Sequence, residues 1–418
     1  MNHENGITGT ARWNVGVAAV FLLGLSVAGA QTQEEALLSR MTHRLEGARE
    51  ELIALRRDIH RHPEVSGREE RTAGVVAARL QSLGLEVQTG VGGHGVVGIL
   101  RGARPGPVVA FRADMDAVSS DAPDPVPFAS EIPGVRHICG HDIHTTVAVG
   151  IAEAMTAIRD QLPGTVKFIF QPAEENVQGA AAMIREGVLE NPAPAAIFAF
   201  HSAPLTVGQI GSVEGLALPG LDRFTAALSG ADTLEQSARI AARAFYALGT
   251  PGDIPPSEYI RVMISGVEPR ADGEAWAVTG LVRVASAEAR TRAQEGIERA
   301  LAELRGQGLS TELSYETLGV LPDMVNDPEL VRSTLEAIRS AVGPEGLLEI
   351  NEVTPQFSED FAYYQQHIPG AMYWLGVANS ELGYNGLPHS PDFAADEEAI
   401  FVGARAMAAV LLDYLEKH

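Results

Sequence analysis

Apolar residues follow two patterns along the chain, a helical spacing and short continuous runs. The helical spacing comes first and predicts helices near the N-terminus. Over Glu34–His60 the apolar residues recur every three or four positions, as on one face of a long amphipathic helix. His62-Pro63 ends that helix, because a proline disfavours helical backbone at the residue before it. A second helix is expected over Arg68–Leu83, with Gly84 in the position of its C-cap.

Short continuous apolar runs follow and alternate with helical patterns. Such runs are typical of strands buried on both faces, so the alternation predicts an α/β fold with parallel strands. The expected strands are Leu85–Gln88, Val96–Leu100, Val108–Arg112, Val166–Phe170 and Ile197–Phe200, and the expected helices are Thr145–Arg159 and Ala180–Glu186.

The pattern changes near Val213. Two helical stretches and two strand-like runs between Gly215 and Leu321 indicate a small α+β insert, with a four-stranded sheet and two helices on one face. These stretches are Leu234–Ala247, Tyr259–Ser265, Trp276–Val284 and Ala287–Leu304. The α/β pattern then returns with an expected helix at Asp327–Val342, a strand at Met372–Gly376 and a final helix at Ala395–Leu415.

The first thirty residues have the pattern of a secretory signal peptide. Arg12 precedes an apolar run over Val15–Val27, and Ala28-Gly29-Ala30 offers small residues for cleavage before Gln31. The run is short for a transmembrane helix, although an uncleaved N-terminal anchor is the alternative. We therefore expect a periplasmic or secreted protein that has no membrane partner once the signal is cleaved.

Composition narrows the class of protein. The 418 residues are 45% hydrophobic and 20% charged, which fits a globular chain rather than a disordered one. Lys and Arg number 31 and Asp and Glu 54, so the net charge of −23 argues against nucleic acid as a partner. Cys139 is the single cysteine, which excludes an intramolecular disulfide and a zinc site built on several thiolates.

Polar residues that can bind metals follow the apolar strands directly. Because ligands bind beyond the carboxyl ends of parallel strands, these side chains are expected at one edge of the sheet. A thiolate, imidazoles and carboxylates together suit Zn²⁺, Mn²⁺, Co²⁺ or Ni²⁺ rather than Ca²⁺ or Mg²⁺. The clusters are Arg112–Asp116, Cys139–His144, Gln171–Glu175, His201 and Pro388–Pro391.

Each cluster also has a plain structural explanation. A lone cysteine is commonly a small buried apolar residue, and adjacent carboxylates such as Glu174-Glu175 are commonly solvated. His201 could equally be a hydrogen-bonded core histidine, and His389 a turn residue. The hypothesis of a metal site depends on five such clusters occurring together.

In these segments the sequence resembles peptidase family M20, within the branch of aminoacylases, amidohydrolases and auxin-conjugate hydrolases. The similarity extends over nearly all of the chain after the signal, apart from the insert. The segments that carry it are Arg57–Glu64, Phe111–Ala117, Cys139–Thr145, Gln171–Glu175, Ser358–Phe361 and Pro388–Phe393.

The resemblance implies a zinc-peptidase-like catalytic domain with a mostly parallel sheet, interrupted by a ferredoxin-like satellite domain that usually dimerises. The expected parts are the signal peptide at 1–30, the catalytic domain at 31–214 and 323–418, and the satellite domain at 215–322. A homodimer through the satellite domain is then the expected partner, besides a small-molecule amide or peptide substrate.

The resemblance also implies a site that holds two divalent transition-metal ions. Cys139 would bridge the ions, Glu174 would be the general base, and Asp116 would orient a ligand imidazole. Asp114, His144 and Arg283 are grouped with Asp116 as supporting or substrate-contacting residues. The remaining metal ligands would be His141, Glu175, His201 and His389, divided between the ions in a way that the sequence does not fix.

The sequence departs from the family pattern in the insert. The family has a histidine near the start of its satellite domain that polarises the scissile carbonyl, but Ala226–Glu235 contains none, nor does any position between His201 and His367. The family's asparagine-containing segment is replaced by Gly266–Arg270, and the segment after the strand-end histidine reads Ser202-Ala203.

Three functions are therefore compared. The first is a secreted metal-dependent amidohydrolase that cleaves N-acyl amino acids, short peptides or related amides. The second is a non-catalytic or weakly active binding protein on the same scaffold, which the missing histidine favours and the presence of Glu174 opposes. The third is a thiol hydrolase with Cys139 as nucleophile and His141 or His144 as base. The substrate, the native metal, the oligomeric state and cleavage of the signal are left open by the sequence.

Overall fold

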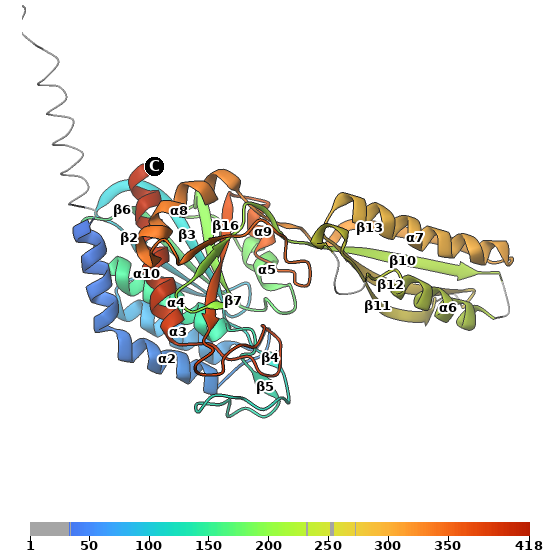
Figure 1. Cartoon of the computed structure of the whole chain (residues 1–418), viewed down its shortest axis with the longest axis horizontal. Helices are drawn as coiled ribbons and strands as arrows, with labels where there is room; N and C mark the ends of the chain where they lie inside the picture. The colour runs from blue at the N-terminus through green and yellow to red at the C-terminus, as the bar shows by residue number, and fades with distance from the viewer. Residues whose placement is uncertain (1–32, 34, 231–232, 251–254, 272) are drawn as a thin grey trace, which may run out of the picture.

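A computed structural model describes the chain from residue 33 to residue 418, except residues 34, 231–232, 251–254 and 272. The expected signal peptide lies outside the described residues. Figure 1 shows a larger body, in which helices cover a central sheet, and a smaller elongated body formed by the insert. Within the part of the chain that is described, no helix is long and apolar enough to cross a membrane.

The central sheet has eight strands in the order β1-β2-β6-β3-β7-β16-β8-β15. Strands β6, β3, β7 and β16 are parallel to their neighbours in this group, as expected. The outer strands differ, because β1 and β2 form an antiparallel pair across the short turn at Gly92-Gly93, and β2 and β8 pair antiparallel with β6 and β16. The bounds are β1 Glu86–Val91, β2 Gly95–Arg101, β3 Arg104–Asp114, β6 Pro163–Gln171, β7 Ala196–Thr206, β8 Ile210–Ser212, β15 Leu347–Glu349 and β16 Gly370–Ala378.

The central strands are apolar without interruption because both faces of the sheet are buried. Along β3, Val109 and Phe111 pack into one hydrophobic core while Ala110 packs into the other. The same alternation occurs in β7, where Phe198 and Ile197 belong to opposite cores. The two-residue period of a strand thus divides one apolar run between two cores.

Helices cover both faces of this sheet (Figure 1). Residues of α2, α3, α4, α8 and α10 form the core on one face, and residues of α5 and α9 belong to the core on the other. The bounds are α2 Arg49–Arg61, α3 Glu70–Ser82, α4 His141–Thr156, α5 Gly179–Arg185, α8 Pro328–Val342, α9 Ala362–Gln365 and α10 Glu398–Lys417.

Most helix bounds shift by one to three residues from those expected, and two of the differences are larger. The long first helix is interrupted by a turn at Ala48, directly after Gly47, a residue type that weakens helices. The helix expected from Thr145 already begins at His141, and its N-cap is Gly140. The second difference matters for the site, because it places His141 and His144 on the first turn of α4.

The insert contains the expected four-stranded sheet with two helices. Its strands are antiparallel in the order β11-β12-β10-β13, and α6 and α7 pack on one face around Phe224 and Phe245. Strands β10 and β13 were not among the expected runs. Strand β13 gives no apolar signal, because it is mostly polar and exposed at the edge of the sheet. The bounds are β10 Leu221–Ser229, α6 Leu234–Tyr246, a 3₁₀ turn at Pro256–Glu258, β11 Ile260–Pro269, β12 Ala275–Val284, α7 Ala287–Gly306 and β13 Ser310–Leu321.

A two-stranded ribbon connects the two bodies. Strand β9 (Gly215–Leu218) pairs antiparallel with β14 (Met324–Asn326), and Ala217, Leu218 and Met324 pack into the core of the larger body. A second short ribbon, β4 (Val118–Ser119) with β5 (Val135–Arg136), precedes Cys139. The division into domains at 214/215 and 322/323 stays a prediction, although it falls beside this connection.

Candidate metal centre

The carboxyl ends of parallel strands bring the predicted polar clusters to one edge of the sheet. Strand β3 ends at Asp114 and β6 ends at Gln171, just before Glu174 and Glu175, while His201 lies within the neighbouring β7. Cys139 precedes α4 directly. Segments far apart in the sequence therefore meet at this edge, as the alternation of strands and helices predicts.

Gly140 allows two neighbouring side chains to face the same space. Its φ angle of 93° is left-handed, and a Cβ atom there would lie 2.8 Å from the hydroxyl oxygen of Ser202. Glycine alone tolerates both conditions without strain. The chain can therefore turn sharply between Cys139 and His141, so that the two side chains converge.

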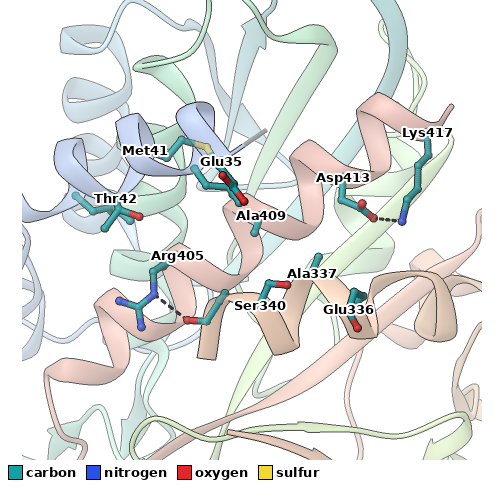
Figure 2. A pocket seen from close by; sticks show the side chains of 13 residues that line it. Glu35, Met41, Thr42, Glu336, Ala337, Ser340, Arg405, Ala409, Asp413 and Lys417 are labelled. Carbon is teal, nitrogen blue, oxygen red and sulfur yellow. Dashed lines mark hydrogen bonds and ion pairs between the residues drawn. The ribbon is translucent and has the colours of Figure 1, made fainter. Parts of the chain in front are cut away.

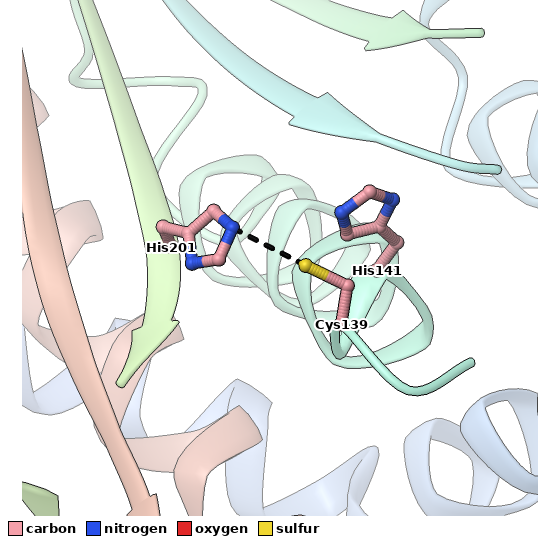
Figure 3. A group of neighbouring side chains, drawn as sticks. All are labelled: Cys139, His141 and His201. Carbon is pink, nitrogen blue, oxygen red and sulfur yellow. Dashed lines mark hydrogen bonds between the residues drawn. The ribbon is translucent and has the colours of Figure 1, made fainter. Parts of the chain in front are cut away.

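Cys139, His141 and His201 form the first group of converging side chains (Figure 3). The sulfur of Cys139 lies 3.4 Å from Nε2 of His201. On the far side of its ring, Nδ1 of His201 lies 2.8 Å from the carbonyl oxygen of Ser202 and must donate its proton to it. Nε2 of His201 therefore carries no proton, and its lone pair is directed at the thiol.

Cys139 also belongs to a second group, with Glu175 and His389. Nε2 of His389 lies 3.3 Å from Oε1 of Glu175. His389 has a left-handed backbone, with φ of 67°, and its amide donates to the carbonyl oxygen of Ile138, beside Cys139. The two groups thus share the thiol of Cys139.

Asp116 supports both groups. Its Oδ1 lies 3.3 Å from Nδ1 of His141, and its Oδ2 accepts hydrogen bonds from the amide of Glu175 at 3.0 Å and from the hydroxyl of Ser66 at 2.6 Å. When His141 is neutral, the contact with Oδ1 of Asp116 places its proton on Nδ1 and leaves Nε2 free. One carboxylate therefore orients a side chain in the first group and the backbone of one in the second.

His144 is fully engaged and offers no free nitrogen. Its Nδ1 lies 2.7 Å from Oδ1 of Asp114, while its Nε2 accepts the amide proton of Ser202 at 2.7 Å. His144 and Asp114 therefore link α4, β3 and β7 beneath the converging side chains. Their contacts are those of supporting residues.

Burial and neighbouring charges determine the protonation of these groups. Burial, followed by the nearby His144, lowers the pKa of His201 to about 3, so that its imidazole is neutral. Hydrogen bonds to Cys139 and Glu175 raise the pKa of His389 to about 10. Burial, together with the charge of Glu175, raises the pKa of the Cys139 thiol, which argues against a free thiolate nucleophile in the absence of a cation.

The free atoms at this site suit divalent metals. Within the described residues, Nε2 of His141 is buried without a hydrogen-bond partner, and it lies 3.7 Å from Oε1 of Glu175, which also contacts Nε2 of His389 at 3.3 Å. A buried polar atom without a partner is rare and costly, but a cation between His141 and Glu175 would satisfy it. Nitrogen, sulfur and carboxylate donors are the set that transition metals such as Zn²⁺ prefer.

Glu174 lies beside this site and has no hydrogen bond from its carboxylate within the described residues. Its Oε2 is 4.0 Å from Nε2 of His141. Burial and the neighbouring carboxylates of Glu359 and Glu175 raise the pKa of Glu174 well above its usual range. The raised pKa gives its carboxylate form a high affinity for a proton, as a general base requires.

The sequence assigned no role to a buried charged network behind Glu174. The guanidinium of Arg112 donates to Asp114 at 2.6 Å, to Glu359 and Asp360 at 2.9 Å each, and through Nε to Gln171 at 2.9 Å. An arginine at the end of an apolar strand was the available signal, because a buried guanidinium requires carboxylate partners. Its partners are 247 and 248 residues away along the chain for Glu359 and Asp360, so no local pattern connects them.

Arg283 does not join the converging side chains. It lies on β12 of the smaller body, and its guanidinium donates to the backbone oxygen of Gln356 in the segment that leads to Ser358–Phe361. A groove of about 510 Å³ beside α8 and α10 also lies apart from the site (Figure 2). Side chains such as Met41, Arg405 and Asp413 line this groove, and it shares no residue with either metal-binding group.

The stretches where the sequence departs from the family pattern lie in the smaller body. Residues 226–229 belong to β10 and Leu234 begins α6, while 231–232 are outside the described residues. Gly266 lies in β11, where the register with β12 shifts. Nothing in the described part of these stretches replaces the missing imidazole.

This fold, with a thiolate, imidazoles and carboxylates converging at the edge of the sheet, is that of a dinuclear-metal hydrolase. The model of peptidase family M20/M25/M40 matches residues 110–413, and the chain belongs to this family. It is accordingly a hydrolase of amide bonds with a metal-binding site. Membership of this family argues against the second function compared above, a non-catalytic binding protein.

Three comparisons illustrate the similarity. The N-acetylcysteine deacetylase of Bacillus subtilis is 33% identical over 87% of this chain and 97% of its own length. The IAA-amino acid hydrolase ILR1-like 4 of Arabidopsis thaliana is 31% identical over 87% and 86%. The crystal structure of YxeP from Bacillus subtilis, a dinuclear metal-binding peptidase of family M20, superposes with a TM-score of 0.74 at 31% identity and covers 89% of this chain and all of that one.

Proposed function

We propose that the protein hydrolyses the amide bond of N-acyl amino acids or of similar small amides. The observation that carries this proposal is the position of Glu174 next to two groups of metal-binding side chains that share Cys139. Its carboxylate is buried and has no hydrogen bond to any described residue. The deacetylase and hydrolase relatives, whose names specify an N-acetylated amino acid and an amino-acid conjugate, support this substrate class.

In this proposal two divalent transition-metal ions bind between Cys139, His141, Glu175, His201 and His389. Such ions polarise an amide carbonyl and make a nearby water more acidic. Asp116 keeps His141 in the tautomer whose Nε2 faces the site, and the carbonyl of Ser202 does the same for His201.

Glu174 would then move the proton. It accepts a proton from the water as the water oxygen bonds to the amide carbon, and it donates that proton to the amide nitrogen as the carbon–nitrogen bond breaks. The products are a carboxylic acid and an amine. Glu174 returns to its unprotonated form, so the reaction balances with water as the sole co-reactant.

The test measures metal content and amidase activity on one purified sample. Chelator-treated protein is supplied with Zn²⁺, Mn²⁺ or Co²⁺ and assayed on a panel of N-acyl amino acids and dipeptides, beside a Glu174→Ala variant. We expect activity to return with metal and to fall by at least about 10²-fold in the variant. Activity that survives complete metal removal would contradict the proposal and favour Cys139 as a nucleophile.

We further propose that the protein is exported and acts outside the cytoplasm. The basic residue, apolar run and small residues over Arg12–Ala30 support this location. N-terminal sequencing of the protein recovered from its native host should begin at Gln31. A start at Met1 would contradict cleavage of the signal.

We also propose a homodimer that forms through the smaller body. Its helix α6 carries Ile240 and Tyr246 with 51% and 70% of their surfaces exposed. Large apolar side chains with that exposure are suited to an interface.

A further inference from the structure

Glu359 has a carboxylate oxygen whose purpose the fold does not explain. The side chain is 2% exposed, and its Oε1 accepts hydrogen bonds from Arg112 and from the amide of Phe361, both at 2.9 Å. Its Oε2 is buried, and within the described residues it has no hydrogen-bond partner. A buried acceptor without a donor is unfavourable, so a structural role alone does not account for this oxygen.

The neighbouring carboxylate of Asp360 has the hydrogen bonds expected of a residue with a purely structural role. Asp360 accepts from Arg112 at 2.9 Å and from Gln171 at 2.7 Å through Oδ1, and from the amide of Ala180 at 3.0 Å through Oδ2. Both of its oxygens are used. The free oxygen in this network is therefore that of Glu359.

The carboxylate of Glu359 lies near the general base. One oxygen each of Glu174, Glu359 and Asp360 lie within 4.8 Å of one another, and all three side chains are buried. Arg112 makes no hydrogen bond to Glu174 among the described residues, and its nitrogens donate to Gln171, Asp114, Glu359 and Asp360 instead. An unprotonated Glu174 gains nothing from Glu359, since two carboxylates repel each other.

The repulsion between Glu174 and Glu359 ends once Glu174 has accepted a proton from the attacking water. Its carboxyl group is then a hydrogen-bond donor, and the neighbouring carboxylate of Glu359 has an unused acceptor in Oε2. We propose that Glu359 is a positioning residue for Glu174, which holds the carboxyl group while it carries the proton from the water to the amide nitrogen. Arg112 and the amide of Phe361 keep Glu359 in place through its other oxygen. This role rests on the proposed function, in which Glu174 is the base.

The first test replaces the acceptor without changing the size of the side chain. In Glu359→Gln, the amide oxygen can still accept from Arg112 and Phe361, but an NH₂ group stands where Oε2 was. We expect kcat to fall about tenfold or more, while KM and the metal content stay within twofold of the wild type. Asp360→Asn is the matched control, because it makes the same change at the adjacent side chain, which has no free acceptor, and its kcat should fall less than that of Glu359→Gln. Equal losses of kcat in the two variants, or a kcat of Glu359→Gln within twofold of the wild type, would overturn the proposal.

The second test needs no activity and uses the metal-free protein. Glu174→Met leaves no donor beside Glu359, whereas Glu174→Gln places an N–H group where the protonated carboxyl has its O–H. The melting temperature should therefore rise by about 3 °C from Glu174→Met to Glu174→Gln, the order expected for one buried hydrogen bond in a chain of this size. The rise should persist in an Asp360→Asn background and disappear in a Glu359→Gln background. An equal rise in both backgrounds would overturn the role of Glu359. If the melting cycle succeeds while no amide is turned over, the proposed function fails and the contact between the two glutamates stands.

Discussion

At the scale of the residue, two histidines one turn apart on α4 have opposite environments. Nε2 of His141 is buried without a partner among the described residues and faces Glu175, whereas both nitrogens of His144 are hydrogen-bonded. A residue that binds a metal leaves a vacant coordination position when it is removed, but a residue that links three elements leaves a weakened fold.

The variants His141→Asn and His144→Asn should therefore separate metal affinity from stability. We expect His141→Asn to lose at least one metal ion per chain, while the stability of the metal-free protein changes little. His144→Asn should keep most of its metal and lose about 1–3 kcal/mol in free energy of unfolding, because the acceptor for Ser202 or the donor for Asp114 is lost. Metal analysis after dialysis and urea denaturation with chelator present measure the two effects. Loss of metal from both variants to the same extent would contradict this distinction.

The sequence predicted which residues meet at the site more fully than what supports them. Cys139, His141, Glu175 and His201 lie at the ends of predictable strands and turns, so their convergence follows from the topology of a parallel sheet, although their roles as ligands stay predictions. Their supporting contacts are less predictable. The contact of Arg112 with Glu359 depends on packing between segments 247 residues apart, and residue type alone does not specify it.

At the scale of the element, the turn into α4 controls the geometry of the site. Gly140→Ala would place a methyl group 2.8 Å from the Ser202 hydroxyl at a left-handed position, and it should cost about 1–2 kcal/mol in stability from the backbone alone. Since Cys139 and His141 flank this position, we also expect metal affinity to fall about 10- to 100-fold.

Gly308→Ala is the matched control for this variant. Gly308 lies in the smaller body with a φ of 96°, and a Cβ atom added there would meet no neighbouring group within 4 Å. The substitution should cost similar stability from the backbone and leave metal affinity unchanged. Competition with a fluorescent chelator measures the affinity, and an equal change in the two variants would show that Gly140 acts through stability alone.

The segment between β4 and β5 is anchored by a buried histidine. Nδ1 of His60 lies 2.8 Å from Asp142 and Nε2 lies 3.0 Å from Asp124, which belongs to that segment. Burial and the nearby Arg56 oppose its charge, but the two carboxylates outweigh them and raise the pKa of His60.

The raised pKa predicts how stability depends on pH. A group whose pKa is higher in the folded state stabilises the fold fully below its unfolded pKa of about 6.5, and this contribution is lost as the pH rises through the folded pKa. The difference in free energy of unfolding between the wild type and His60→Gln should therefore be larger at pH 6 than at pH 9. Urea denaturation with chelator present tests this, with the exposed His43→Gln as control. A difference that grows with pH would contradict the assigned charge state of His60.

Elements were predicted best where one residue pattern determines them. The buried runs of β3, β6 and β7 and the amphipathic helices α6 and α7 follow from the period of their apolar residues. The polar edge strand β13 lacks such a signal, because hydrogen bonds to β10 rather than its own apolar pattern determine its conformation. The antiparallel direction of β1 and β2 depends on the turn at Gly92-Gly93, which the apolar pattern does not reveal.

At the scale of the whole molecule, the smaller body extends away from the sheet that holds the site (Figure 1). It has a hydrophobic core of its own, formed between its four strands and α6 and α7. A body with its own core and a narrow connection can carry an interface without disturbing the metal centre. The proposed homodimer is therefore expected to form there.

The mass of the particle in solution tests that arrangement. Light scattering after size-exclusion chromatography should give about twice the mass of one chain. The double variant Ile240→Glu, Tyr246→Glu should give the mass of one chain, because two charges would be buried at the interface without partners. Leu382→Glu is the control, since Leu382 is 58% exposed but lies on the larger body, and it should leave the dimer intact. If the wild type has the mass of a single chain, or if only Leu382→Glu disrupts the dimer, the smaller body is not the interface. A monomeric double variant that retains metal and amidase activity would show, in addition, that one chain holds a complete site.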